Sequence, residues 1–445
     1  MLRVLVFMVA FTALHPATER ARAETRPAVH HEARVHLDPE SRELRVEDRF
    51  TVEVDDFISF DLAPWLNVVE ARVDGRRVAT DRGGNRVTIP KVAAGYRQFE
   101  VFLRGSVPAL PAPSARGTSR GAVADAEGSY LSGYASWLPD TGDEWIEYDL
   151  TVEVPEPYRA VATGRLAKET VYRGDYRASF TSDHSGEMPS VFARPYKIAE
   201  RRDGDLRIRT YLHSELASLA DEYMEEAATY IRRYAEQIGP YPYADFHIVS
   251  APLPVGLGFP NLTYVGRMVL PLPFMRGRSL AHEILHNWWG NGVAVDYDRG
   301  NWAEGLTTYL ADYAVAEDQG EEAARKMRLG WLRNLAALPP EQDMPVESFT
   351  VKRHDAAQVV GYDKVALIFH MLKAEVGDKA FASGLRRFWE DRRFRVAGWS
   401  DLQSAFESTA GRDLVWFFDQ WLERAGAPRI ELINAESSNA NGEHR

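Results

Sequence analysis

The most informative segment of the sequence is His282-Glu283-Ile284-Leu285-His286-Asn287-Trp288-Trp289-Gly290. Its two histidines are four residues apart, so on a helix they lie on one face, one turn apart, and both imidazoles can reach the same ion. Glu283 faces the same cleft without binding the metal, and from there its carboxylate can take a proton from a metal-bound water. The pattern predicts a helix that carries two metal ligands and a catalytic general base.

A third candidate ligand follows eighteen residues after His286. Glu304 lies in the run Asn301–Tyr309, which predicts a second helix that begins near Trp302 and can pack against the first. Two neutral imidazoles and one carboxylate are typical ligands of a catalytic zinc site, which keeps an open position for water and lowers its pKa to about 7. We therefore predict one Zn²⁺ per chain, bound by His282, His286 and Glu304. The alternative is a pair of surface histidines that binds no metal, and the third candidate ligand disfavours it.

These residues resemble a known family. His282–Gly290, Asn291 and Trp302–Gly305 are similar to the zinc core of the aminopeptidase-N-like gluzincin metallopeptidases, although the gap from histidine to glutamate is one residue shorter than usual. The resemblance is firm from near Ser214 to Pro428. It implies a thermolysin-like, mostly helical catalytic domain in a short, exported member of the family without the additional C-terminal domains.

The resemblance also implies a second catalytic residue. Tyr362-Asp363-Lys364 resembles the family's Tyr-x-Lys-Gly segment, with Val365 where glycine is usual. In the family this tyrosine donates a hydrogen bond to the tetrahedral oxyanion, a role that a phenol can fill beside zinc. We therefore expect Tyr362 to be catalytic, and the alternative is an aromatic core residue at the start of a helix.

One departure from the family bears on the substrate. Family aminopeptidases carry a Gly-x-Met-Glu-Asn strand whose glutamate holds the free α-amine, whereas the corresponding stretch here, Val255–Tyr264, contains no carboxylate. Without an anion, an α-ammonium group would be desolvated unpaired, which costs several kcal/mol. We therefore expect a metallopeptidase that cleaves peptide or protein substrates without a strict need for a free N-terminus. An ordinary zinc aminopeptidase is the close alternative, and a catalytically silent peptide-binding protein with the same fold is the alternative from another class.

Other polar residues near the zinc helices are weaker candidates. Asn287, Asn291 and Asp312 are placed to orient the metal ligands, with capping or surface roles as alternatives. Asp140 lies with Asp143 and Glu144 in a polar loop that can approach the cleft, but we interpret these three as solvated loop residues.

The hydrophobic periodicity changes once along the chain. From Ala33 to about Arg209 apolar and polar residues alternate with a period of two, which indicates an antiparallel β domain. Val107–Gly128, rich in Pro, Ala, Gly and Ser, indicates a long loop in it. From Ser214 the spacing becomes three and four, with a helix expected to end at Gly239-Pro240. We predict an α+β multidomain chain with these segments: signal peptide 1–23, β-rich domain 24–210, catalytic domain 211–435 and polar tail 436–445.

Composition and the N-terminus set the compartment and the partners. The chain of 445 residues has a net charge of −12 and no cysteine, which argues against nucleic-acid binding and excludes disulfides, thiolate ligands and cysteine nucleophiles. The apolar run Val4–Leu14, followed by Ala21-Arg22-Ala23, is typical of a cleaved secretory signal. An uncleaved anchor is the alternative. We expect export to the periplasm or the extracellular space, with no integral membrane segment after signal removal, and we make no prediction of the oligomeric state.

Overall fold

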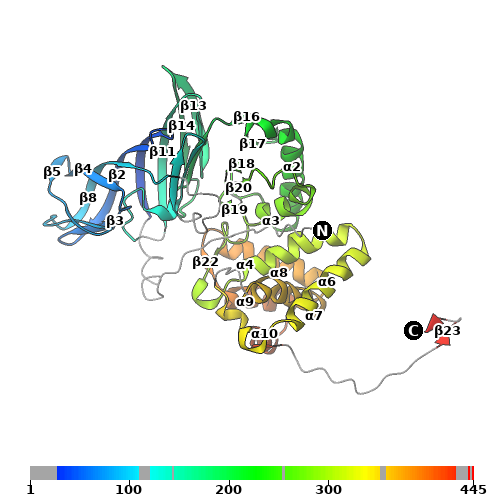
Figure 1. The fold of residues 1–445 in the computed structure, drawn as a ribbon. Helices are drawn as coiled ribbons and strands as arrows, with labels where there is room; N and C mark the ends of the chain where they lie inside the picture. Colours follow the sequence, from blue (N-terminus) through cyan, green and yellow to red (C-terminus); the bar gives the residue numbers. More distant parts are fainter. Residues whose placement is uncertain are drawn as a thin grey trace.

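The computed structural model describes residues 28–109, 121–142, 145–252, 256–350, 357–426, 439–440 and 443–444. The predicted signal peptide therefore lies outside the described residues, as do Asp143 and Glu144. A β-rich part comes first, and a mostly helical part follows it (Figure 1). This order confirms the predicted fold class.

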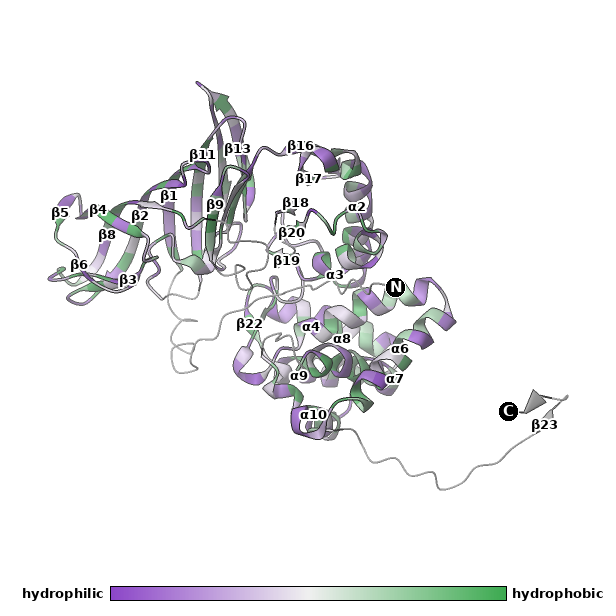
Figure 2. Ribbon diagram, viewed as in Figure 1, coloured by the Kyte–Doolittle hydropathy of each residue, from purple (hydrophilic) through white to green (hydrophobic). Residues whose placement is uncertain are grey.

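An eight-stranded sheet forms most of the β-rich part, in the order β13-β14-β11-β1-β2-β8-β4-β5. Along β1 and β2 buried and exposed residues alternate, and the same alternation of hydropathy follows the strands in Figure 2. Neighbouring strands are antiparallel as expected, except that β1 and β11 run parallel. The strands of this sheet are β1 (Val29–Asp38), β2 (Glu43–Val54), β4 (Leu66–Val73), β5 (Arg76–Val78), β8 (Gly95–Ser106), β11 (Ile146–Pro155), β13 (Arg165–Tyr172) and β14 (Asp175–Thr181).

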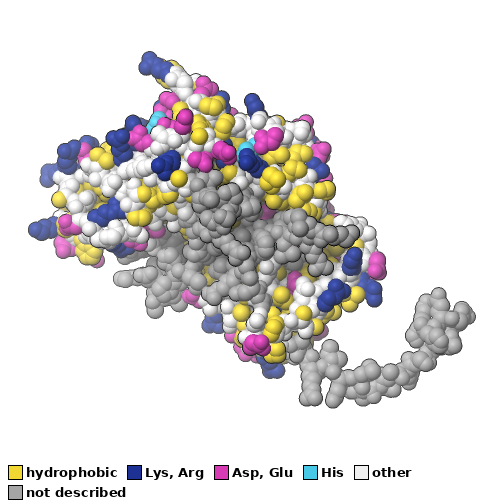
Figure 3. Space-filling model, in the orientation of Figure 1, with side chains coloured by type: hydrophobic (Ala, Val, Ile, Leu, Met, Phe, Trp, Pro, Cys, Tyr) yellow, Lys and Arg dark blue, Asp and Glu magenta, His cyan; other side chains and the backbone are white. Residues whose placement is uncertain are grey.

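Two smaller sheets complete the β-rich part, and both share its hydrophobic core. Part of the segment expected to be a long loop is a strand, because Ala122–Asp125 pairs with the next strand along the chain. On the visible face of this part, basic and acidic side chains are interspersed (Figure 3). The strands of these sheets are β3 (Ile58–Asp61), β6 (Asp81–Gly83), β7 (Arg86–Ile89), β9 (Ala122–Asp125), β10 (Gly128–Leu131), β12 (Arg159–Ala162) and β15 (Val191–Arg194).

A five-stranded mixed sheet joins the two parts, in the order β16-β17-β18-β20-β19. The central strands β17, β18 and β20 are parallel, and the edge strands β16 and β19 are antiparallel to their neighbours. The expected junction near residue 210 lies inside β17, which pairs with β18 in this sheet. The strands are β16 (Lys197–Asp203), β17 (Leu206–Leu212), β18 (Asp245–Ala251), β19 (Gly256–Phe259) and β20 (Leu262–Gly266).

Helices pack on this sheet and below it (Figure 1), around a second hydrophobic core. The helix expected from Ser214 begins with a 3₁₀ turn, Ser214–Leu219, and continues as α2. Within the described residues, the helices are too short or too polar to cross a membrane. The helices are α2 (Ala220–Gln237), α3 (Leu280–Leu285), α4 (Ala303–Thr307), α5 (Ala314–Asp318), α6 (Glu321–Ala336), α7 (Val365–Val376), α8 (Asp378–Arg392), α9 (Trp399–Ala410) and α10 (Val415–Leu422).

Short elements fill the remaining connections. Three π-helical turns, η3 (Met275–Ser279), η5 (Thr308–Tyr313) and η8 (Val359–Lys364), adjoin α3, α4 and α7. The two-residue strands β21 (Ala294–Val295) and β22 (Val396–Ala397) pair in parallel. The described residues of the predicted polar tail form a strand pair, β23 (Asn439–Ala440) and β24 (Glu443–His444).

Candidate metal centre

The first helix of the centre holds its histidines rigidly. All residues of α3 are buried, and His286 lies at its C-terminal end. The Nδ1 atom of His286 is 2.9 Å from the Trp289 carbonyl oxygen, which orients the ring. Trp288 and Trp289 are fully buried in the helical core. The buried tryptophans that follow α3 therefore anchor this helix in the core, while the polar side chains of the helix point to the metal centre.

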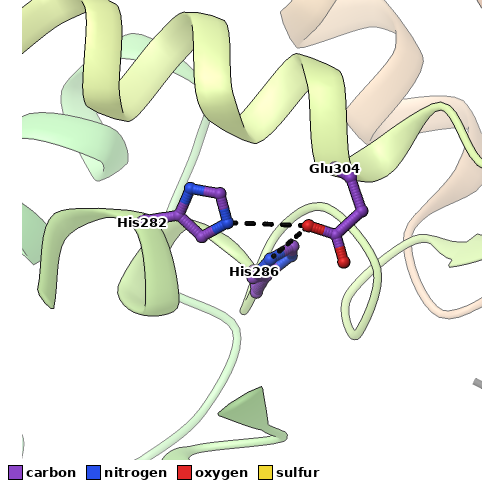
Figure 4. A group of neighbouring side chains, drawn as sticks. All are labelled: His282, His286 and Glu304. Atoms are coloured by element: carbon purple, nitrogen blue, oxygen red, sulfur yellow. Dashed lines mark ion pairs between the residues drawn. The ribbon is translucent and has the colours of Figure 1, made fainter. Parts of the chain in front are cut away.

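The second helix brings the carboxylate to these histidines. The Asn301 side-chain oxygen accepts the backbone N–H groups of Ala303 and Glu304 at 3.0 and 3.4 Å, which caps the start of α4. Glu304 Oε2 then lies 3.6 Å from Nε2 of His282 and 3.6 Å from Nε2 of His286 (Figure 4). Among the described residues, this is the one group of three ligand-type side chains whose atoms converge, within 4.8 Å.

The three side chains fit a zinc ion. His286 Nε2 and Glu304 Oε2 are buried, and neither has a hydrogen-bond partner among the described residues. Leaving such atoms unsatisfied costs about 1–3 kcal/mol each. Two ligand atoms about 2.1 Å from one tetrahedral zinc ion are about 3.4 Å apart, close to the 3.6 Å observed. The geometry thus favours a metal ion over direct hydrogen bonds.

Asp312, from η5, holds the first ligand from behind. Its Oδ2 atom is 2.6 Å from Nδ1 of His282, which leaves Nε2 of that ring directed at Glu304. Burial lowers the pKa of His282, but the Asp312 carboxylate outweighs it and raises this pKa to about 10. Burial likewise raises the pKa of Glu304, yet the two imidazoles bring it far below its usual range. The centre therefore favours positive charge, as a cation site must.

The other two polar candidates have different surroundings. The Asn287 side-chain oxygen accepts the backbone N–H of Asn261 at 2.8 Å, so it ties α3 to the turn before β20 rather than to a metal ligand. Asn291 lines a cavity beside the centre. Asn291 meets a ligand residue only through its backbone, whose N–H donates to the His286 carbonyl oxygen at 3.1 Å. Among the described residues, Asp312 is the one candidate of the three whose side chain hydrogen-bonds to the side chain of a ligand.

Glu283 lies directly against the edge strand β19. Its side chain is buried, and a Cβ atom placed on Gly258 would be 2.6 Å from Glu283 Oε2. The strand can approach the carboxylate this closely because residue 258 is a glycine. The sequence shows that this stretch lacks a carboxylate, but it does not reveal the contact of Gly258 with Glu283, because that contact depends on how α3 crosses the sheet edge.

Tyr362 lies in η8, and its side chain is buried. Burial, and then the charge of Glu304, raise the pKa of the Tyr362 phenol well above 10, so that it remains protonated and able to donate. The three π-helical turns of the chain's described part all border the centre or lead into its helices. Such turns are frequent at functional sites, and no spacing rule in the sequence revealed them.

Comparison with known proteins gives concordant matches. Residues 278–421 match the model of the Peptidase family M1 domain. Aminopeptidase N of Lactococcus lactis subsp. lactis is 26% identical over 167 residues, 35% of this chain and 19% of the relative. Aminopeptidase N of Streptomyces lividans is 28% identical over 172 residues, 35% of this chain and 20% of the relative. The chain thus matches about a fifth of the length of these curated relatives.

A solved structure extends the likeness over nearly the whole chain. It is an M1 zinc metallopeptidase variant from Deinococcus radiodurans bound to a Tyr-Ser-Ala substrate, with a TM-score of 0.74 and 21% identity. The alignment covers 90% of this chain and 96% of that chain. At this identity the likeness shows a common fold, which includes the β-rich part.

Proposed function

We propose that this chain, whose residues 278–421 belong to the M1 peptidase family, is a zinc-dependent metallopeptidase. The family match bears out the resemblance to the aminopeptidase-N-like gluzincins and supports a peptide-bond hydrolase. The observation that carries the proposal is the convergence of His282, His286 and Glu304 on one buried point. One zinc ion bound there would act as a Lewis acid and make water nucleophilic near neutral pH.

The remaining groups divide the proton and charge transfers among them. Glu283 accepts a proton from the attacking water and returns it to the nitrogen of the leaving amine. Tyr362 donates a hydrogen bond to the substrate carbonyl oxygen as that oxygen becomes negative, a contact that stabilises the transition state more than the ground state. Asp312 keeps the His282 ring in the orientation that directs Nε2 into the centre.

We further propose that hydrolysis does not strictly need a free substrate N-terminus. β19 carries no carboxylate over Gly256–Phe259, and Gly258 lies so close to Glu283 that a side chain there would displace this carboxylate. The strand therefore offers no anion to an α-ammonium group beside the base. Ordinary aminopeptidase activity is the second candidate, and the aminopeptidases among the matched relatives favour it.

A pair of peptides with the same sequence, one with a free and one with an acetylated N-terminus, separates the two specificities. We expect kcat/KM for the two peptides to agree within about tenfold, because β19 contributes no charge that would distinguish them by more than about 1.4 kcal/mol. Cleavage confined to the free peptide would instead establish an aminopeptidase.

The chemistry itself is tested by Glu283→Gln. The substitution removes the base but none of the three ligands, so peptide hydrolysis should fall by at least about a thousandfold while zinc content stays unchanged. Full activity in this variant would contradict the mechanism. If the wild-type chain binds peptides without cleaving them, the chain is a silent binding protein.

We also propose export, on the basis of residues 1–23 alone. Sequencing of the mature N-terminus from the native host should find the chain beginning after Ala23. An intact N-terminus in the membrane fraction would indicate a retained anchor instead.

A further inference from the structure

A cavity of about 490 Å³ lies between the β-rich part and the zinc-binding part of the molecule. Its volume is in the range of specific ligand pockets. Tyr134 and Glu187 belong to its β-rich wall, and Phe259, Gly290 and Asn291 to the opposite wall. Because the walls come from both parts, the cavity exists only where the two parts meet.

The cavity lies beside the metal centre, although the side chains of the centre are not among the described residues that line it. Phe259 follows Gly258, the residue that lies against Glu283. On the other side, Gly290 lies behind His286, because a Cβ atom placed on it would be 3.4 Å from Nδ1, the ring nitrogen turned away from Glu304. A peptide that leaves the centre along β19 therefore meets this cavity within a few residues, since an extended chain advances about 3.3 Å per residue. β19 is at the edge of its sheet, where an extended peptide can add as a further strand.

Among the described residues, the charge of the cavity wall is predominantly negative. The carboxylates of Asp140, Asp183 and Glu187 line it, against one guanidinium, Arg165, which is already bonded to Asp183 at 2.8 Å. Burial lowers the pKa of His184, which also lines the cavity, so that this ring adds no positive charge near neutral pH.

Glu187 is held in place and is accessible. The Tyr134 hydroxyl donates to Glu187 Oε2 at 2.6 Å, and the Glu187 side chain is exposed. Burial, and then the charge of Glu187, raise the pKa of Tyr134 well above 10, so the phenol keeps its proton and this bond. The aromatic rings of Phe259, Tyr243 and Trp145 also line the cavity and suit the methylene stem and the charged head of a basic side chain.

We propose that this cavity binds a Lys or Arg side chain of the peptide substrate and that Glu187 is the residue that selects it. The inference rests on the proposed peptide hydrolysis. A cation that reaches Glu187 forms a charge-assisted hydrogen bond, whereas a neutral side chain of the same size does not. The protein therefore prefers peptides with a basic residue at one fixed position relative to the cleaved bond.

Cleavage-site profiling on a library of acetylated peptides tests this preference. The wild-type chain should cleave peptides enriched in Lys and Arg at a single position. Glu187→Gln should lower kcat/KM for basic peptides about tenfold and leave that for matched norleucine peptides unchanged. Glu32→Gln is the matched control, because this exposed glutamate on β1 lies outside the cavity wall, and it should behave as the wild type.

Three results would overturn the inference. The first is a wild-type profile without basic enrichment, and the second is an equal loss on basic and neutral peptides in Glu187→Gln. The third is a loss that follows the free α-amine of unblocked peptides, whatever the side chain, because it would assign Glu187 to the substrate N-terminus.

Binding separates this inference from the proposed function. In the Glu283→Gln background, calorimetry with an acetylated lysine peptide and its norleucine analogue measures selection without turnover. Weaker binding of the lysine peptide on adding Glu187→Gln supports the cavity assignment even if the wild type proves inactive, and equal binding contradicts it even if the wild type hydrolyses peptides.

Discussion

Two histidine–carboxylate pairs, each with a buried imidazole, lie in different parts of the molecule. In the β-rich part, His31 Nδ1 is 2.8 Å from Asp48 Oδ2, and neither side chain is exposed. In the metal centre, His282 Nδ1 is 2.6 Å from Asp312 Oδ2. The two pairs have the same chemistry and nearly the same length, yet only one belongs to a candidate site.

The difference lies at the other ring nitrogen. His31 Nε2 has no hydrogen-bond partner in the described part of the chain, and its ring lies 5.1 Å from the Phe50 ring in the β core. The corresponding atom of His282 faces Glu304, which His286 also faces. A carboxylate bonded to Nδ1 thus orients the imidazole in both pairs. A cation site forms only where two further metal-ligand groups, here Glu304 and His286, face Nε2 of the same ring.

Asp312→Asn tests whether the carboxylate at the metal centre supports zinc binding. The amide keeps the size of the side chain but loses the charge that orients His282 and favours a cation, so zinc affinity should fall about 10–100-fold. Competition with a chromophoric chelator measures the dissociation constant. Unchanged affinity would mean that the pair at the centre is as structural as the pair in the β-rich part.

Gly258→Ala should have a smaller effect, on turnover alone. The new Cβ would contact the flexible end of Glu283, so folding tolerates it, but the displaced base should lower kcat about tenfold with zinc content unchanged. Gly330→Ala is the matched control, because a Cβ there meets nothing within 4 Å. Equal kcat in both variants would show that Glu283 does not need its observed position.

Asp48→Asn should leave zinc content and kcat/KM unchanged. It weakens a buried hydrogen bond to His31, so the free energy of unfolding should fall by about 1–3 kcal/mol. Chemical denaturation followed by tryptophan fluorescence measures this loss. A lower zinc content in folded Asp48→Asn would break the distinction between the two pairs.

The spacing of residues in the sequence predicts much of the convergence of the candidate ligands. Residues four apart on a helix share a face whatever the rest of the chain does, so the geometry of His282 and His286 followed from the motif. The role of Asp312 did not, because a carboxylate at that distance along the chain fits a surface position equally well. In the structure Asp312 lies in η5, and its Oδ2 atom is 2.6 Å from Nδ1 of His282.

The β-rich part was harder to predict in detail. Period-two alternation identifies strands, but it does not specify which sheet a strand joins. The predicted boundary at residue 210 therefore falls inside β17, which pairs with β16 and β18 in the mixed sheet. The parallel pairing of β1 with β11 has no local signal either. Glu187 was missed because its cavity forms between segments far apart in the sequence.

Zinc titration of the metal-depleted wild-type chain tests whether His282, His286 and Glu304 bind a catalytic zinc ion. Peptide hydrolysis is measured as zinc is added in known amounts below and above the protein concentration. Activity should rise in proportion to zinc and level off at one ion per chain. Hydrolysis that is the same with and without zinc would contradict the assignment of His282, His286 and Glu304 as the catalytic metal centre.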